Sequence, residues 1–137
     1  MSLINYAQTG NIEEIQKMIK NGKLKKEDIM MTDNYNETAL FWASCCGHLE
    51  IVKLLITIGN LQKEDIMMKD NYNQTALYVA SSNGHLEIVN LLIIKGNLQK
   101  EDIMMKNNNG NTALYWASYN GHLEIVKLLI TLGNLQK

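Results

Sequence analysis

Residues 111–129 read NTALYWASYNGHLEIVKLL, and this stretch decides the fold because close copies of it occur earlier in the chain. Residues 74–92 read QTALYVASSNGHLEIVNLL, and residues 37–55 read ETALFWASCCGHLEIVKLL. The three start positions, 37, 74 and 111, are 37 residues apart. A fixed period of this length predicts a repeat architecture, in which each unit packs only against its neighbours.

The same period extends backwards to the N-terminus. Leu3 falls on the position of Leu40, and Gly10 falls on the position of Gly47. The chain of 137 residues therefore contains about three and a half copies of one unit and forms a single domain. We place a capping half repeat at 1–25 and repeats at 26–62, 63–99 and 100–137.

Each copy has the pattern of two helices and a turn. In the second copy Thr75 is a candidate N-cap for a short helix, and Gly84 can take the left-handed conformation that ends it. Residues 86–93 are apolar around most of a helix, so both sides need cover from neighbouring copies. Gly96 is expected to stop this second helix. Residues 107–111 are Asn and Gly, which favour a tight finger-like hairpin.

These residues and their spacing resemble the ankyrin repeat family. The family pattern is G-x-TPLHLAA-x-x-GHLEVVKLLL followed by a short G-A-D-V-N connector, and three GHLE blocks match it at a fixed period. The resemblance covers residues from about Leu3 to Lys137. It implies an all-α solenoid of stacked helix–turn–helix units with protruding finger loops. It also implies a scaffold that binds a protein or peptide through its concave face and finger tips.

The sequence departs from the family pattern in two places. The period is 37 residues instead of the usual 33, and the extra four residues follow Gly59 and Gly96. We expect a longer, partly helical connector there, packed through Leu61 and Leu98. The family's TPLH histidine is replaced by an aromatic residue at Phe41, Tyr78 and Tyr115.

Composition narrows the function classes. The chain is 46% hydrophobic and 20% charged with a net charge of −1, and none of its 13 basic residues is Arg. This removes the electrostatic case for nucleic acid or an anionic membrane as a partner. No basic-then-apolar segment of the signal-peptide type and no membrane-length apolar run occurs in residues 1–137, so we expect neither a secreted nor a membrane-spanning chain. The adjacent Cys45 and Cys46 do not suit a disulfide framework. A cytoplasmic location is expected.

The sequence offers little for catalysis, a metal or a cofactor. His48, His85 and His122 recur once per unit, so they are expected to lie roughly 10 Å apart along the stack. Zinc ligands must converge within about 2.0–2.1 Å of one ion, so these residues are not expected to form a zinc site. Each histidine is instead expected to stand at the start of the second helix of its repeat. The Met pairs at 30–31, 67–68 and 104–105 are expected to fill gaps in the hydrophobic core. We expect no enzyme activity, no cofactor and no metal.

Differences between the copies point to the partner-binding surface. They concentrate in the fingers and on the first helices, and several involve large aromatic residues of the kind that anchor interfaces. The alternative is that these residues drift without consequence or pack between repeats, Trp42 and Trp116 especially. The residues predicted to contact a partner are Tyr35, Phe41, Tyr72, Tyr78, Tyr115, Trp116 and Tyr119.

The two ends of the repeat array differ chemically. Glu14 and Lys17 stand where later copies carry apolar residues, as a capping repeat requires. The last copy keeps Ile125 and Leu129 and has no polar cap. Two alternative expectations follow from this uncapped end. Either the chain is a piece cut from a longer array, or it self-associates weakly through this end. A further alternative is a targeting or spacer arm of a larger protein whose catalytic domain lies outside this chain.

Overall fold

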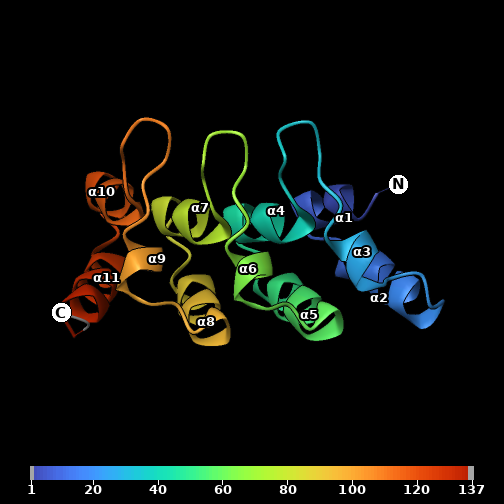
Figure 1. Cartoon of the computed structure of the whole chain (residues 1–137). Helices are drawn as coiled ribbons and strands as arrows, with labels where there is room; N and C mark the ends of the chain where they lie inside the picture. The colour runs from blue at the N-terminus through green and yellow to red at the C-terminus, as the bar shows by residue number, and fades with distance from the viewer. Residues whose placement is uncertain (1, 136–137) are drawn as a thin grey trace.

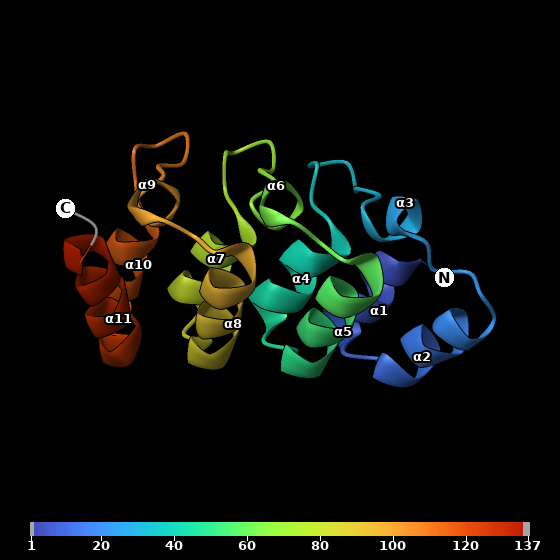
Figure 2. The same cartoon turned by 60° about the horizontal axis from the view of Figure 1, so that its bottom comes forward.

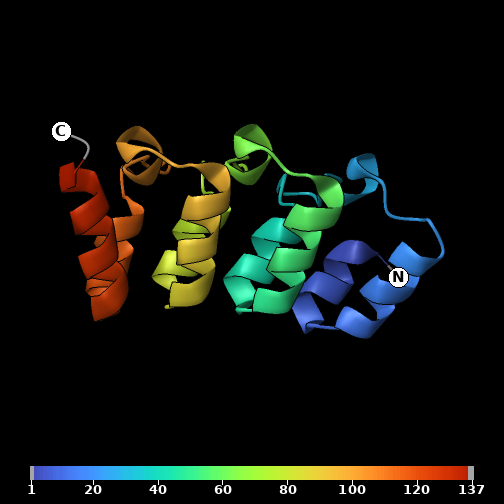
Figure 3. The same cartoon turned by 90° about the horizontal axis from the view of Figure 1, so that it is seen from below.

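The computed structural model describes residues 2–135, and its regular structure in this range consists of eleven helices. Met1, Gln136 and Lys137, the last two within the predicted final repeat, lie outside the described residues. Four helix pairs stack in chain order from one end of the molecule to the other (Figures 1 and 3). The pairs are α1 (Leu3–Thr9) with α2 (Ile12–Lys20), α4 (Ala39–Cys46) with α5 (Leu49–Gly59), α7 (Ala76–Ser82) with α8 (Leu86–Gly96), and α10 (Ala113–Tyr119) with α11 (Leu123–Leu135).

The first helices begin where the sequence predicts. The Oγ1 atoms of Thr38, Thr75 and Thr112 each accept a hydrogen bond at 3.1 Å from the main-chain N–H three residues later. Gly84 follows α7 with φ +85°, the predicted left-handed conformation.

Helix α8 ends at Gly96, as expected, and the left-handed residue that follows the helix is Asn97, with φ 48°. Position 96 requires a small residue because a Cβ atom there would lie 2.8 Å from the Leu98 side chain. The glycine therefore makes room for the connector that folds back onto the helix.

One continuous hydrophobic core runs through all four helix pairs. The second helices bury Ile51 and Leu55 in α5 and Ile88 and Leu92 in α8. These residues are covered on both sides, as their apolar circumference predicts.

The four extra residues of each copy lead into a one-turn helix, as expected. These helices are α3 (Lys26–Ile29), α6 (Lys63–Ile66) and α9 (Lys100–Ile103), and they lie in a row along one side of the stack (Figure 2). Leu61 and Leu98, which precede α6 and α9, are buried against the ends of α5 and α8, as expected. Ion pairs join neighbouring connectors, from Lys26 to Asp65 at 2.9 Å and from Lys63 to Asp102 at 2.7 Å. The longer period thus adds a second line of contact between repeats.

Three finger loops, residues 31–37, 68–74 and 105–111, project in one direction from the stack (Figure 1). Each turns at a residue with positive φ, namely Asn36, Asn73 or Gly110. Neighbouring fingers are hydrogen-bonded, since Asn71 N–H donates to Tyr35 O and Asn108 N–H donates to Tyr72 O, both at 2.9 Å. The fingers therefore form one mutually supported row.

The recurring histidines tie neighbouring helix pairs together. His85 Nε2 lies 3.0 Å from Cys45 O, and His122 Nε2 lies 3.0 Å from Ser82 O. A Cβ atom on Gly47 would lie 2.6 Å from the His85 ring, so the glycine lets the ring approach. His48 and His85 immediately precede α5 and α8, as expected.

Candidate protein-binding surface

The first candidate surface lies at the tips of the fingers. Tyr35 and Tyr72 are 53% and 50% exposed, and their rings stack with centroids 6.2 Å apart and an angle of 26° between the planes. Asp33 Oδ1 accepts hydrogen bonds at 3.0 Å from the N–H groups of Tyr35 and Glu37, which fixes the turn that carries Tyr35. In the second finger, Asp70 Oδ1 accepts hydrogen bonds from the N–H groups of Tyr72 and Gln74 in the same way. The exposed rings are thus presented on rigid loops.

The second candidate surface is an aromatic cluster on α10. Trp116 is half-buried and makes edge contacts with Tyr115 and Tyr119, each with ring centroids 5.3 Å apart. Tyr115 and Tyr119 stack on each other at 6.5 Å and are 50% and 73% exposed. The sequence predicted these three residues as contacts, and the structure brings them together.

Phe41 and Tyr78 are not part of the exposed surface, so the structure does not place them as predicted. They are 6% and 7% exposed and form a buried cluster with Val79, bordered by Trp42 and Trp116. The physical reason is the stack itself, because the next helix pair covers each ring. These two residues pack between repeats, in agreement with the alternative interpretation.

Tyr115 occupies the repeat position of Phe41 and Tyr78, yet it is half exposed. No helix pair follows α11 within residues 2–135, so nothing in the described chain covers it. Leu123 and Ile130 are exposed for the same reason. The end of the stack beside α10 and α11 is therefore apolar.

A buried carboxyl pair lies at the base of the first two fingers. The pKa of Glu37 is raised from 4.5 to about 8, first by burial and then by its interaction with Asp70 and the charge of Asp33. The Oδ2 atom of Asp70 is buried and has no hydrogen-bond partner among the described residues. A proton on Glu37 gives this pair a potential hydrogen-bond donor.

Asp33 remains ionised beside this pair. Burial alone would raise the pKa of Asp33, but hydrogen bonds from the Trp42 indole and from the Glu37 and Tyr35 N–H groups outweigh it and lower the pKa. The Trp42 Nε1–H donates to Asp33 Oδ2 at 3.0 Å. Trp42 thus supports the first finger from α4.

The Cys45 thiol is not poised for nucleophilic chemistry. Cys45 is half-buried and Cys46 exposed, and neither forms a disulfide. Burial raises the pKa of the Cys45 thiol, and the neighbouring Cys46 contributes in the same direction. A raised pKa favours the unreactive thiol form.

Within residues 2–135, no group of three or more His, Cys, Asp and Glu side chains is arranged to hold a metal ion. None of the described helices combines the length and the apolar composition needed to cross a membrane.

Comparison with protein-family models identifies the class that this architecture defines. The family described as "Ankyrin repeats (3 copies)" matches residues 3–102 and again residues 60–137. The chain therefore belongs to the ankyrin repeat family. Ankyrin repeats are generally protein–protein interaction modules, and the domain is typically non-catalytic. No curated protein matches the chain in a sequence comparison.

Sequence analysis missed the Glu37–Asp70 pair. Its signal is that Glu37 and Asp70 are acidic where the next copies carry Gln74 and Asn107. It also missed a cavity beside α1, where Ile4 occupies the repeat position of the three larger aromatic residues Phe41, Tyr78 and Tyr115.

Proposed function

We propose that this chain is a non-catalytic module that binds a protein or peptide partner across its finger tips and the aromatic cluster on α10. The observation that carries the proposal is the stacked Tyr35–Tyr72 pair, half exposed at the tips of hydrogen-bonded fingers. Tyrosine supplies large contact area with few rotatable bonds, so little conformational entropy is lost on binding.

Other features support the same assignment. Tyr115, Trp116 and Tyr119 add a second aromatic patch on the first helix of the last pair. The net charge of −1 and the absence of Arg do not suit a polyanionic partner such as nucleic acid. The free Cys45 and Cys46 thiols fit a reducing compartment such as the cytoplasm, and we include a cytoplasmic location in the proposal.

The test uses a peptide selected from a display library against the wild-type chain. The double variant Tyr35→Asn/Tyr72→Asn copies Asn109, the residue that the third finger carries at this position, so the finger fold is kept. We expect its Kd for the selected peptide to rise about 30-fold, since each ring is replaced at an interface anchor.

A matched control removes an exposed apolar side chain elsewhere. Ile94 on α8 is exposed, and the other copies carry Thr57 and Thr131 at its position. Ile94→Thr is expected to leave the Kd unchanged. A Tyr35→Asn/Tyr72→Asn variant that binds as tightly as wild type would show that the finger tips are not the binding surface.

Self-association is a second candidate, favoured by the apolar end of the stack. Ile130 is 45% exposed, whereas Ile93 at the same repeat position is 8% exposed. A symmetric contact between two such ends would cover Tyr115 and Ile130 in both copies. Light scattering is expected to show a mass that rises with concentration and a monomer for Ile130→Lys. A wild-type chain that stays monomeric at every concentration would contradict this candidate.

A further inference from the structure

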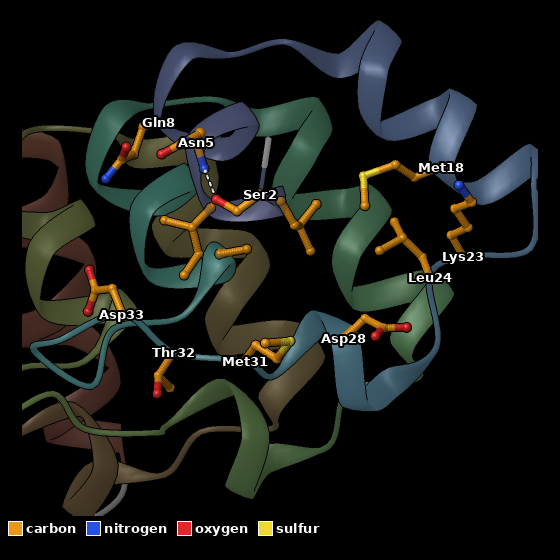
Figure 4. Close-up of a pocket in the computed structure, with 13 residues that line it drawn as sticks. Ser2, Asn5, Gln8, Met18, Lys23, Leu24, Asp28, Met31, Thr32 and Asp33 are labelled. Carbon is orange, nitrogen blue, oxygen red and sulfur yellow. Dashed lines mark hydrogen bonds between the residues drawn. The ribbon is translucent and has the colours of Figure 1, made fainter.

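A cavity of about 530 Å³ lies beside α1, between the first helix pair and the first finger. Figure 4 shows Asp33 and Gln8 toward one end and Met18 and Leu24 toward the other, with Ser2 between them. Its lining surface is mostly apolar, and charged side chains stand at both ends, Asp33 at one and Lys23 and Asp28 beside Met18 and Leu24 at the other. A mostly apolar cavity with a few polar groups is typical of a ligand-binding site.

The repeat period shows what fills the corresponding place elsewhere in the chain. Ile4 lines the cavity, and Tyr78 occupies its position two periods later. The Tyr78 ring spans the gap to the third finger, where its hydroxyl group accepts a hydrogen bond from Asn107 Nδ2 at 2.9 Å. Trp116 also hydrogen-bonds the Tyr78 hydroxyl. Ile4 is too short to span this gap, so the space beside α1 remains open.

Beside α1 there is no counterpart of the Tyr78 hydroxyl group, but polar side chains stand at the positions of its two partners. Asp33 and Trp42 stand at the positions of Asn107 and Trp116, two periods earlier. With no hydroxyl group between them, Trp42 Nε1–H donates directly to Asp33 Oδ2. Asp33 lines the cavity and, as a carboxylate, can accept a further hydrogen bond.

The end of the cavity at Met18 and Leu24 also departs from the later copies. A Cβ atom on Gly59 would lie 2.8 Å from Leu61, and one on Gly96 equally close to Leu98. Nothing lies within 4 Å of the corresponding point on Gly22. Leu24 therefore does not close over the helix end as Leu61 does, and it lines the cavity instead.

We propose that this cavity binds the hydroxyphenyl side chain of a tyrosine in a partner polypeptide. The hydroxyl group donates to the Asp33 carboxylate, and the ring fills the apolar space beside Ile4 that the chain's own Tyr78 fills two periods later. The inference rests on the proposed protein-binding function and names one anchor of the partner. A polypeptide source fits because the occupant of the equivalent site is itself a side chain on a polypeptide.

The experiment follows the methyl groups of Met18 and Met31, which line the cavity, by NMR of the full chain. The probe is N-acetyltyrosinamide, which has a tyrosine side chain and uncharged ends. We expect saturable shifts of both methyl signals. N-acetylphenylalaninamide, which lacks only the hydroxyl group, should bind about ten-fold more weakly because the hydrogen bond to Asp33 is lost.

A variant that fills the cavity and a variant outside it provide the comparison. Ile4→Tyr introduces the side chain that the chain uses at Tyr78, so it should fill the cavity, abolish probe binding and raise the midpoint of thermal unfolding by about 3 °C. Ile94→Thr, at an exposed position on α8 that does not line the cavity, should bind the probe as wild type does. Unchanged probe binding to a folded Ile4→Tyr variant would overturn the proposal.

The remaining outcomes each decide one part of the inference. Equal binding of the tyrosine and phenylalanine probes would overturn the role of Asp33. Tighter binding of free tyrosine than of N-acetyltyrosinamide would overturn the polypeptide source. None of these measurements involves the finger tips, so failure here is distinguishable from failure of the Tyr35–Tyr72 test, which uses its own ligand and variants.

Discussion

Replacing Glu37 by Gln is expected to stabilise the protein in a pH-dependent way. Glu37 is 8% exposed, and its pKa of about 8 keeps it protonated at neutral pH, whereas its pKa in the unfolded chain is near 4.5. Gln has the shape of a protonated Glu, requires no proton and can donate to Asp70. The chain already carries Gln74 at this position of the next finger.

The magnitude follows from the difference between the two pKa values. Between pH 4.5 and about 8 the folded chain holds a proton on Glu37 that the unfolded chain releases, so wild-type stability falls as pH rises through this window. The slope is about 1.4 kcal/mol per pH unit. At pH 7 the Glu37→Gln variant is therefore expected to be more stable by about 3 kcal/mol, while below pH 4.5 the two proteins converge.

The assay is urea unfolding followed by circular dichroism from pH 4 to pH 8.5. Glu87→Gln, at an exposed position on α8, serves as the control and should change stability by less than about 0.5 kcal/mol at any pH. Parallel stability curves for wild type and Glu37→Gln would refute the reasoning, because they would mean that Glu37 titrates alike in both states.

Four further substitutions test the packing between repeats by the same unfolding assay. Tyr78→Phe removes the hydroxyl group that Asn107 binds and should lower the free energy of unfolding by about 1 kcal/mol. An unchanged midpoint of urea unfolding would argue against that hydrogen bond. Gly84→Ala should cost about 2 kcal/mol, since its Cβ atom would lie 2.6 Å from the neighbouring histidine ring. Gly121→Ala shares the positive φ but meets nothing within 4 Å, so its loss should be nearer 1 kcal/mol, and equal losses would discount the ring contact. Leu98→Ala should cost about 3 kcal/mol because this buried side chain packs the connector against the end of α8, and a loss below 1 kcal/mol would place it outside the core.

The repeat period made the helix pairs and fingers predictable, since each local signal recurs and must satisfy the same neighbours. Thr75 as an N-cap and the burial of Leu61 and Leu98 follow from such recurrence. The exposure of the aromatic residues could not be predicted from this recurrence, because the same repeat position is buried at Tyr78 and half exposed at Tyr115. Exposure depends on whether a neighbour covers the residue, which the pattern within one copy does not contain.

The chemistry that the sequence did not predict depends on contacts between copies. The raised pKa of Glu37 arises from its burial and from Asp70 on the next finger, which lies far along the chain. The cavity beside α1 arises because Ile4 is smaller than the aromatic residues of the later copies. In both cases the informative signal is a single departure from the repeat, whose effect becomes clear only after the copies are stacked.

The most direct test of the proposed binding surface is amide hydrogen exchange of the full chain with and without a display-selected peptide. The account predicts slower exchange in the first two fingers, 31–37 and 68–74, and along α10, with little change in α5 and α8. Protection confined to α5 and α8, with exchange in the fingers unaltered, would contradict it.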